Sequence, residues 1–191
     1  VEVTAITYGF NYRPNGLQFT IIDQDNNGIG VFSGSGSFGY NFKTGDAITV
    51  WGEVDQFAGL TQIRLDSLEL ASENNTLIDP LQITSLDETT ESKFIEFVGV
   101  SYPQPDQWLG DGTSYNVDIT DGINTITMRI DSDSPFSTME APDPASFIIG
   151  IGGQFDNSEP FDDGYQFFPI AFEPYLSAED ILEEGDFTVF P

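Results

Sequence analysis

The chain of 191 residues contains no cysteine and no histidine. Without cysteine it forms neither disulfides nor thiolate metal sites. Without histidine it lacks Ser-His-Asp and Cys-His catalysis, histidine-bound zinc and the usual general base at neutral pH. These two absences remove the commonest catalytic arrangements, and we expect a protein that is not an enzyme.

Positive charge is also scarce, with 5 Lys and Arg residues against 32 Asp and Glu residues and a formal net charge of -27 at pH 7. Such a surface repels nucleic acids, because binding to phosphates depends on Lys and Arg. It suits cations, basic partners or solubility in salt. No hydrophobic run approaches the roughly 20 residues of a membrane helix. We therefore expect neither nucleic-acid binding nor membrane insertion.

Hydrophobic residues nevertheless make up 39% of the chain, and 17 residues are Phe. This composition is typical of a folded protein and not of a disordered acidic tail. The sequence begins at Val1 without a methionine or a signal peptide. We interpret it as a mature protein or as a segment of a longer secreted one.

A pattern of roughly 90 residues occurs twice, which indicates two copies of one small β domain. Each copy predicts a hairpin, a strand that ends in a Gly-rich Gln-Phe turn, and a closing strand that begins with glycine and contains Gln. In the first hairpin, Asn27-Gly28 supplies the positive φ angles of a tight turn. The predicted hairpins are 17–22 with 29–33 and 114–119 with 125–130, and further strands are expected at 1–10, 47–54, 60–70, 94–101, 146–152, 165–172 and 186–190.

Five short strands in each copy, with one longer connection late in the unit, favour a five-stranded Greek-key barrel of the OB type. We therefore predict an all-β protein built from two tandem OB-like barrels. The first spans 1–86 and the second 87–191. One short helix is expected at 177–184, where Ser177 is a suitable N-cap residue.

The motifs of both copies resemble those of OB-fold β-domains from secreted and cell-surface proteins of Bacteroidota, and the resemblance covers most of the chain. It is carried by Gly45-Asp46, Gly52-Glu53-Val54, Phe57, 59–63, 150–160, 163–169 and 179–181, of which Gly-Gly-Gln-Phe-Asp at 152–156 and Gly-Tyr-Gln at 164–166 are the most specific. Such domains often carry an Arg where this chain has Ile170. The resemblance implies a fold and an extracellular location, whereas no activity accompanies it.

Two acidic segments are candidates for Ca²⁺. Asp23-x-Asp25-x-Asn27-Gly28 matches the first half of a calcium loop, although its twelfth position is Gly34 and not Glu. A hairpin turn rich in Asn and Asp is the alternative. The second candidate consists of Asp156, Glu159, Asp162 and Asp163.

Aromatic side chains are candidates for contact with a ligand or with a neighbouring subunit. They are Tyr8, Phe10, Tyr12, Trp51, Tyr102 and Trp108. On an OB fold, aromatic rings stack on bases or sugars. The negative charge disfavours bases, so sugars or subunit packing remain, and burial in the barrel cores is the alternative.

Two short patterns predict a glycoprotein. Asp66-Ser67-Leu68 fits the Asp-Ser/Thr-apolar pattern of O-glycosylation known in Bacteroidota, and Asn74-Asn75-Thr76 is an N-glycosylation sequon in a predicted loop. The candidate acceptors are therefore Ser67 and Asn74.

The chain begins and ends with candidate strands that contain Val1, Val3, Phe187 and Val189. A terminal strand can pair with the sheet edge of a neighbour, and repeated head-to-tail contact builds a filament. Alternatively, each strand closes its own barrel.

We therefore expect a non-enzymatic, extracellular structural or surface protein, such as a filament or matrix subunit, that associates with itself. The alternative is an accessory module of a larger secreted enzyme that binds carbohydrate or a protein partner.

Overall fold

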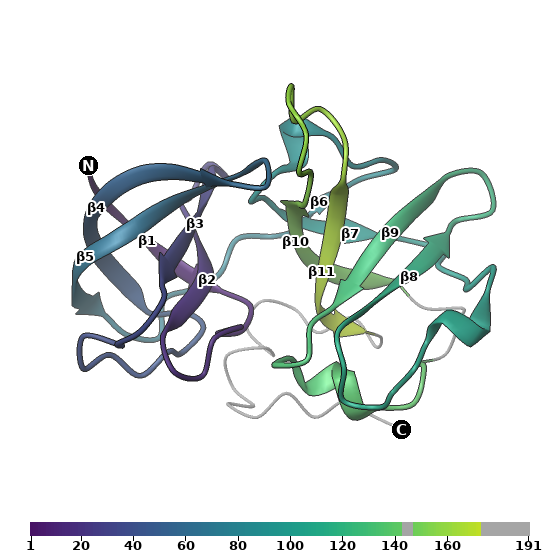
Figure 1. Cartoon of the computed structure of the whole chain (residues 1–191), viewed down its shortest axis with the longest axis horizontal. Coiled ribbons are helices and arrows are strands. Elements are labelled where there is room, and N and C mark those ends of the chain that lie inside the picture. Colours follow the sequence, from purple (N-terminus) through teal and green to yellow (C-terminus); the bar gives the residue numbers. More distant parts are fainter. Residues whose placement is uncertain (143–146, 173–191) are drawn as a thin grey trace.

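The computed structural model describes residues 1–142 and 147–172. Its regular structure is nearly all β and forms two sheets that lie side by side (Figure 1). The predicted all-β class is confirmed. The helix expected at 177–184 and the strand expected at 186–190 lie outside the described residues.

The first sheet closes into a barrel in the order β1-β2-β3-β5-β4. Its strands are β1 (Glu2–Tyr8), β2 (Leu17–Ile22), β3 (Gly28–Ser33), β4 (Ala47–Phe57) and β5 (Leu60–Ser72). Strands β3 and β5 run parallel, whereas the other neighbours are antiparallel.

The second sheet has six strands in the order β6-β7-β10-β11-β9-β8. They are β6 (Leu81–Gln82), β7 (Phe94–Phe97), β8 (Tyr115–Thr120), β9 (Thr125–Ile130), β10 (Ile148–Gln154) and β11 (Tyr165–Phe172), and the connections include the 3₁₀ turns η1 (Glu88–Thr90), η2 (Pro105–Gln107) and η3 (Pro135–Thr138). A single bridge between Ser101 and Thr120 joins the segment after β7 to the end of β8. Strand β6 belongs to this sheet, although its residues precede the domain boundary predicted at 86.

The two sheets contain the same arrangement of three strands, since β2-β3-β5 corresponds to β8-β9-β11. In the first sheet Val31 of β3 pairs with Ile63 of β5, and in the second Met128 of β9 pairs with Phe167 of β11. Both pairs are parallel and both point into a core. The repeat in the sequence is therefore also a repeat of strand register.

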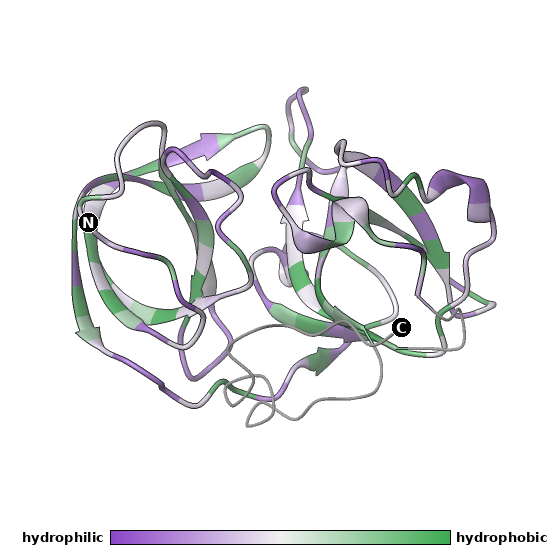
Figure 2. Cartoon of the chain, turned by 90° about the horizontal axis from the view of Figure 1, so that it is seen from below, coloured by the Kyte–Doolittle hydropathy of each residue, from purple (hydrophilic) through white to green (hydrophobic). Residues whose placement is uncertain are grey.

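Alternating side chains produce three hydrophobic cores among the described residues. Figure 2 shows the hydrophobic and hydrophilic bands along the strands. One core fills the first barrel and another lies on the second sheet. The third is shared by both halves and consists of Ile6, Tyr8, Ile22, Leu77, Phe94, Ile149, Ile151, Ile170 and Ala171. Within it, the rings of Tyr8 and Phe94 lie 5.0 Å apart.

A turn of the first sheet also fixes the second sheet by polar contacts. The side chain of Asn26, a residue with φ of 60°, donates to the Phe94 carbonyl at 2.9 Å and accepts from the Phe94 amide at 2.8 Å. Lys93 Nζ donates to the Asn26 carbonyl at 3.0 Å. Gly28 has no room for a side chain, because a Cβ there would lie 1.8 Å from the Ser92 carbonyl oxygen. The two halves therefore meet in one continuous, closely packed junction.

Candidate ligand cleft between the two sheets

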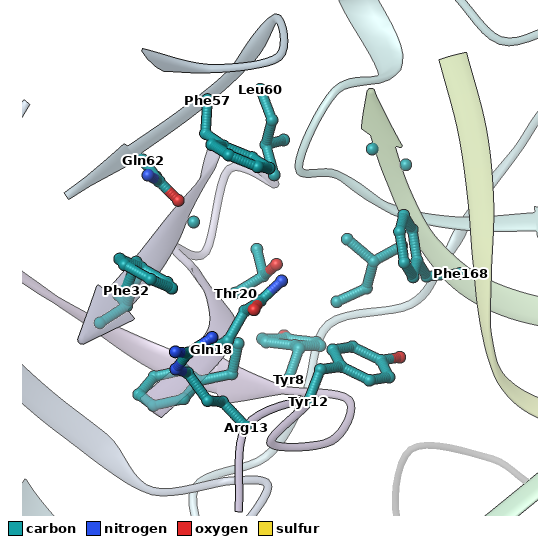
Figure 3. Close-up of a pocket in the computed structure, with 16 residues that line it drawn as sticks. Tyr8, Tyr12, Arg13, Gln18, Thr20, Phe32, Phe57, Leu60, Gln62 and Phe168 are labelled. Carbon is teal, nitrogen blue, oxygen red and sulfur yellow. The ribbon is translucent and has the colours of Figure 1, made fainter. Parts of the chain in front are cut away.

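A cavity of about 260 Å³ opens beside this junction (Figure 3). Its first wall is the outer face of the barrel around β2, β3 and the start of β5, and its second wall comes from β10 and β11. The aromatic and aliphatic residues that line it are Tyr8, Tyr12, Phe19, Val31, Phe32, Phe57, Leu60, Ile151 and Phe168.

The barrel wall follows from strand alternation. Phe19, Val31 and Ile63 point into the barrel core, so their neighbours point outward. In the register of the sheet, Thr20 lies beside Gly30, and Gly30 lies beside Gln62. Because glycine has no side chain, a hollow remains between Thr20 and Gln62. A Cβ on Gly30 would approach the Gln62 Cβ to 3.2 Å.

Three polar side chains in the cleft lack partners in the part of the chain that the structure describes. No protein hydrogen bond reaches the side-chain amides of Gln18 and Gln62 or the hydroxyl of Thr20 within that part. Gln62 is only 8% exposed, and Figure 3 shows both amides directed into the space between Phe32 and Phe168. A polar ligand or water in the cleft would satisfy these groups.

Arg13 is the positive charge of this site. Its Nε donates to the Gly34 carbonyl at 2.8 Å, and its guanidinium carbon lies 5.2 Å from the centre of the Phe32 ring. The terminal guanidinium nitrogens have no carboxylate partner among the described residues, where the salt bridge present joins Arg64 to Glu53. A positioned cation therefore remains available to a ligand.

The wall from the second sheet is built by glycines and one ring. A Cβ on Gly152 would lie 2.0 Å from the Thr90 carbonyl oxygen, and one on Gly153 would lie 2.7 Å from the Phe168 ring. Phe168 also packs against Tyr12, with ring centres 5.7 Å apart. Burial, together with the charge of Asp131, raises the pKa of the Tyr12 hydroxyl, so this group stays neutral.

The two Gln-Phe turns of the repeat meet at the edge of the cleft. The ring centres of Phe57 and Phe155 lie 6.3 Å apart, and the Asp156 amide donates to the Ala58 carbonyl at 2.7 Å. Each Gln stabilises its own turn. Gln56 Nε2 donates to the Gly59 carbonyl at 2.7 Å, and Gln154 Nε2 donates to two carbonyls of the 155–164 loop at 2.7 and 2.9 Å.

The aromatic residues predicted as ligand contacts occupy several different places. Tyr8 and Tyr12 line the cleft. Phe10, Tyr102 and Trp108 pack against the core of the second sheet, which corresponds to the alternative of core packing. Trp108 also donates its indole N–H to the Met139 carbonyl at 2.7 Å. Trp51 lies on β4, opposite Glu2 on one side and Ser67 on the other.

The turn that resembles a calcium loop has the geometry of a hairpin turn, which is the alternative interpretation. Asp23 Oδ1 accepts from the Asp25 and Asn27 amides at 2.9 and 2.8 Å. Burial alone would raise the pKa of Asp23, but the hydrogen bonds from Asn27 and Asp25 and the charge of Lys93 lower it overall. The carboxylate is thus used within the turn, and Ca²⁺ binding there stays a prediction.

The second acidic candidate is spread along the loop between β10 and β11. Asp156 Oδ1 accepts from the Ser158 amide at 2.9 Å, and Asp163 Oδ1 accepts from the Gly164 amide at 2.7 Å. Glu159 and Asp162 are exposed. Among residues 1–142 and 147–172, no three acidic side chains gather in a way that could hold a metal ion.

Both candidate glycosylation residues are exposed. Ser67 lies on β5, and Asn74 lies in a turn with φ of 56°. The Asn74 side-chain oxygen accepts from Lys43 Nζ at 2.7 Å. Modification of either residue stays a prediction.

The first terminal strand belongs to its own barrel. The Val1 ammonium group donates to the Gly52 carbonyl at 2.7 Å, and Val3 lies opposite Val50 in the β1-β4 pair. This arrangement corresponds to the alternative in which the strand closes its own barrel. Phe187 and Val189 lie outside the described residues.

The residues that shape the cleft were not among the predicted ligand contacts, apart from Tyr8 and Tyr12. The missed residues are Arg13, Gln18, Thr20, Gly30, Phe32, Gln62 and Phe168. The usable signal was a glycine within a predicted strand, which often marks close approach of a ligand or another backbone.

No helix in the described part of the chain is long and apolar enough to cross a membrane. No protein-family model matches the chain, and no curated protein matches it either.

Proposed function

We propose that this protein is a non-enzymatic, extracellular module of two OB-type barrels that binds carbohydrate in the cleft between them. The barrel order β1-β2-β3-β5-β4 supports the OB assignment for the first half. In the second half, the corresponding order and the bridge from Ser101 to Thr120 support it. OB folds bind oligosaccharides and oligonucleotides on the face of strands 2 and 3 and on the adjoining loops, and the cleft lies on this face.

The observation that carries the proposal is the combination of rings and unpartnered polar groups in one cavity. Phe32, Phe57 and Phe168 offer apolar faces to the C–H face of a sugar ring. The amides of Gln18 and Gln62 offer both donors and acceptors to hydroxyl groups. A nucleic acid is disfavoured because the net charge of -27 opposes the approach of a phosphate chain.

The size of the cavity limits the ligand. Its volume of about 260 Å³ lies just below the roughly 300–1,000 Å³ of pockets for drug-sized ligands. We infer that one or two sugar rings enter it, as at the end of a chain or at a branch.

Binding without catalysis fits the groups that are present. The lining supplies amide, hydroxyl and guanidinium groups, whereas glycoside hydrolysis generally uses a pair of carboxyl groups. Assembly into a filament stays a prediction from the terminal strands, and Val1 and Val3 already pair within the protein's own barrel.

A glycan array followed by titration calorimetry tests this function. The wild-type protein is expected to bind a subset of glycans, and Gln62→Leu is expected to weaken binding at least about tenfold, which corresponds to about 1.4 kcal/mol. Gln166→Leu is the matched control, because Gln166 holds the same register position in the second sheet and lies outside the cleft.

Equal loss of binding in both variants would mean that the cleft is not the site. Absence of binding to any glycan would exclude the proposed function. Negative-stain microscopy of the same material, with and without EDTA, would then show whether filaments form instead and whether cations stabilise them.

A further inference from the structure

We infer that the sugar in this cleft carries a carboxylate group and that Arg13 binds it. This inference rests on the proposed function, since it names the class of glycan that the same cleft accepts. Three features of the cleft support it: the free end of a positioned arginine, the local distribution of charge, and the amides of Gln18 and Gln62 beside it.

The first feature is the geometry of Arg13. Its Nε is already bound to the Gly34 carbonyl, and its guanidinium carbon lies over the Phe32 ring, 5.2 Å from the ring centre. These two contacts restrain the side chain and leave the two terminal nitrogens for another acceptor. A guanidinium group binds a carboxylate through two parallel hydrogen bonds, which are stronger than those between neutral groups. The two terminal nitrogens of Arg13 are therefore positioned to bind a planar anion.

The second feature is the charge around the cleft. Although the chain has 32 acidic residues, none of the described residues that line the cavity is Asp or Glu. Arg13, in contrast, is one of only 5 Lys and Arg residues. The described lining of the cavity therefore holds one cation and no carboxylate, whereas acidic groups act on it from outside: Asp131 on Tyr12 and Glu91 on the Thr61 amide.

The third feature is the position of Gln18 and Gln62. Figure 3 shows the Gln18 amide beside the Arg13 guanidinium, with Gln62 on the other side of Phe32. A sugar whose carboxylate lies on Arg13 would present its ring hydroxyls to these amides. Neutral donors and acceptors beside the cation suit a ligand that has one charge and several hydroxyl groups.

The net charge limits how acidic the ligand can be. A long polyanion would be repelled by the surface as a whole, whereas one carboxylate on an otherwise neutral sugar is affected mainly by the nearest charges. Uronic acid residues at the end of a chain have this property. We therefore expect selection for isolated acidic sugars over highly sulfated chains.

Matched ligands and matched variants test the inference. The ligands are uronate trisaccharides containing glucuronate, galacturonate or mannuronate, each compared with its neutral methyl ester. The protein is expected to bind at least one acid about tenfold or more tightly than its ester. Arg13→Gln should abolish this preference, and Arg13→Lys should retain only part of it. Arg129→Gln is the control, because it changes the net charge equally but lies on β9, away from the cleft.

Each outcome separates the inference from the proposed function. If esters or other neutral glycans bind as tightly as the acids, or if Arg13→Gln keeps the preference, the carboxylate is not recognised although glycan binding stands. If no glycan of any kind binds, the proposed function fails and the inference fails with it. Binding only to peptides that end in a free carboxylate would overturn the choice of a glycan. Circular dichroism and thermal unfolding of each variant verify that the fold is retained.

Discussion

The same three-strand face occurs in both halves; among the described residues, the face of the first half lines a cavity, whereas that of the second half is hydrogen-bonded to another segment. In the first sheet the row across the face is Thr20, Gly30 and Gln62. The corresponding row in the second sheet contains Asp118 and Thr127. There, Gln107 donates to Asp118 Oδ2 at 3.0 Å and accepts from the Asp118 amide at 2.7 Å. Asp118 on the second face therefore has its hydrogen-bond partner within the protein itself.

Arg13 of the first half and Arg129 of the second half differ in the same way, in whether their terminal nitrogens have a partner. Arg129 donates to the Asn116 side chain at 3.1 Å on the second sheet, whereas Arg13 has its terminal nitrogens free of carboxylate partners in the described residues. Polar side chains without protein partners beside a cavity call for an explanation, and the proposed ligand supplies one.

The largest expected effect concerns the core that the two halves share. Phe94 is 1% exposed within it, and Phe94→Ala should destabilise the protein by about 3–5 kcal/mol. Urea unfolding followed by the fluorescence of Trp51 in one half and Trp108 in the other should give one common midpoint, because both halves lose the same core. Phe38→Ala, at an exposed ring, should change stability by about 0.5 kcal/mol or less. Two separate midpoints would show that the halves unfold independently.

The next effect concerns the hydrogen bonds that join Asn26 of the first half to Phe94 of the second half. Asn26→Gly keeps a residue that tolerates positive φ but removes two hydrogen bonds to Phe94. At about 0.5–1.5 kcal/mol for each bond, the expected loss is about 1–3 kcal/mol. Gln24→Gly, in the exposed part of the same turn, measures the cost of an added glycine. Equal losses of unfolding free energy in the two variants would show that these hydrogen bonds contribute little.

A substitution at Gly30 tests directly whether the two faces differ because a side chain is missing there. Gly30→Thr introduces the residue that the second sheet has at the same position, Thr127. Its side chain should fill the hollow and weaken glycan binding at least about tenfold, or about 1.4 kcal/mol. The converse change, Thr127→Gly, should create no second site, because the Gln107 side chain is already hydrogen-bonded to Asp118. Unchanged affinity of Gly30→Thr in calorimetry would place the ligand elsewhere.

The smallest effect depends on pH. Glu91 of the second half accepts from the Thr61 amide of β5 at 3.1 Å, while its Oε2 is buried without a partner among the described residues. Burial raises the pKa of this carboxyl above its ordinary value, despite the opposing hydrogen bonds from Thr61, and the charge of Glu88 adds to the rise. Ionised Glu91 therefore disfavours the folded state, and this unfavourable contribution disappears as the pH falls through the folded-state pKa and below the ordinary value.

Glu91→Gln should accordingly stabilise the protein at pH 7, and this gain should shrink as the pH is lowered to 4. Because solvent screens the half-buried group, the gain should stay below about 1 kcal/mol. Urea unfolding at both pH values measures it, with Glu69→Gln at an exposed position of β5 as the control. A gain that is independent of pH would exclude titration of Glu91 as its cause.

Strand alternation made much of the fold predictable. The strands expected at 125–130 and 165–172 coincide with β9 and β11. Apolar residues alternate regularly along β9, whereas β11 is marked by an apolar run that follows Gly164. The first strand was predicted at 1–10 but ends at Tyr8, where Gly9 takes a φ of 74°. Boundaries of this kind depend on which neighbour the strand pairs with, and pairing is a tertiary property.

The candidate site was much less predictable. Alternation alone places Gln18 and Thr20 on the outside of the barrel, opposite to Phe19. It does not tell which outer face lines a cavity. That depends on Gln107 reaching Asp118 in one copy, whereas no described side chain is hydrogen-bonded to the Thr20 hydroxyl in the other.

The sequence by itself determined the all-β class, the repeat, the hairpins and the acidic surface, because these depend on local alternation, turn residues and composition. Only the tertiary structure decided that Asn26 docks on the second half and that Arg13, Gln18 and Gln62 surround one cavity. These contacts join residues that lie far apart in the chain. They exist because burial of the shared core brings the two sheets together and leaves the hollow at Gly30 facing Phe168.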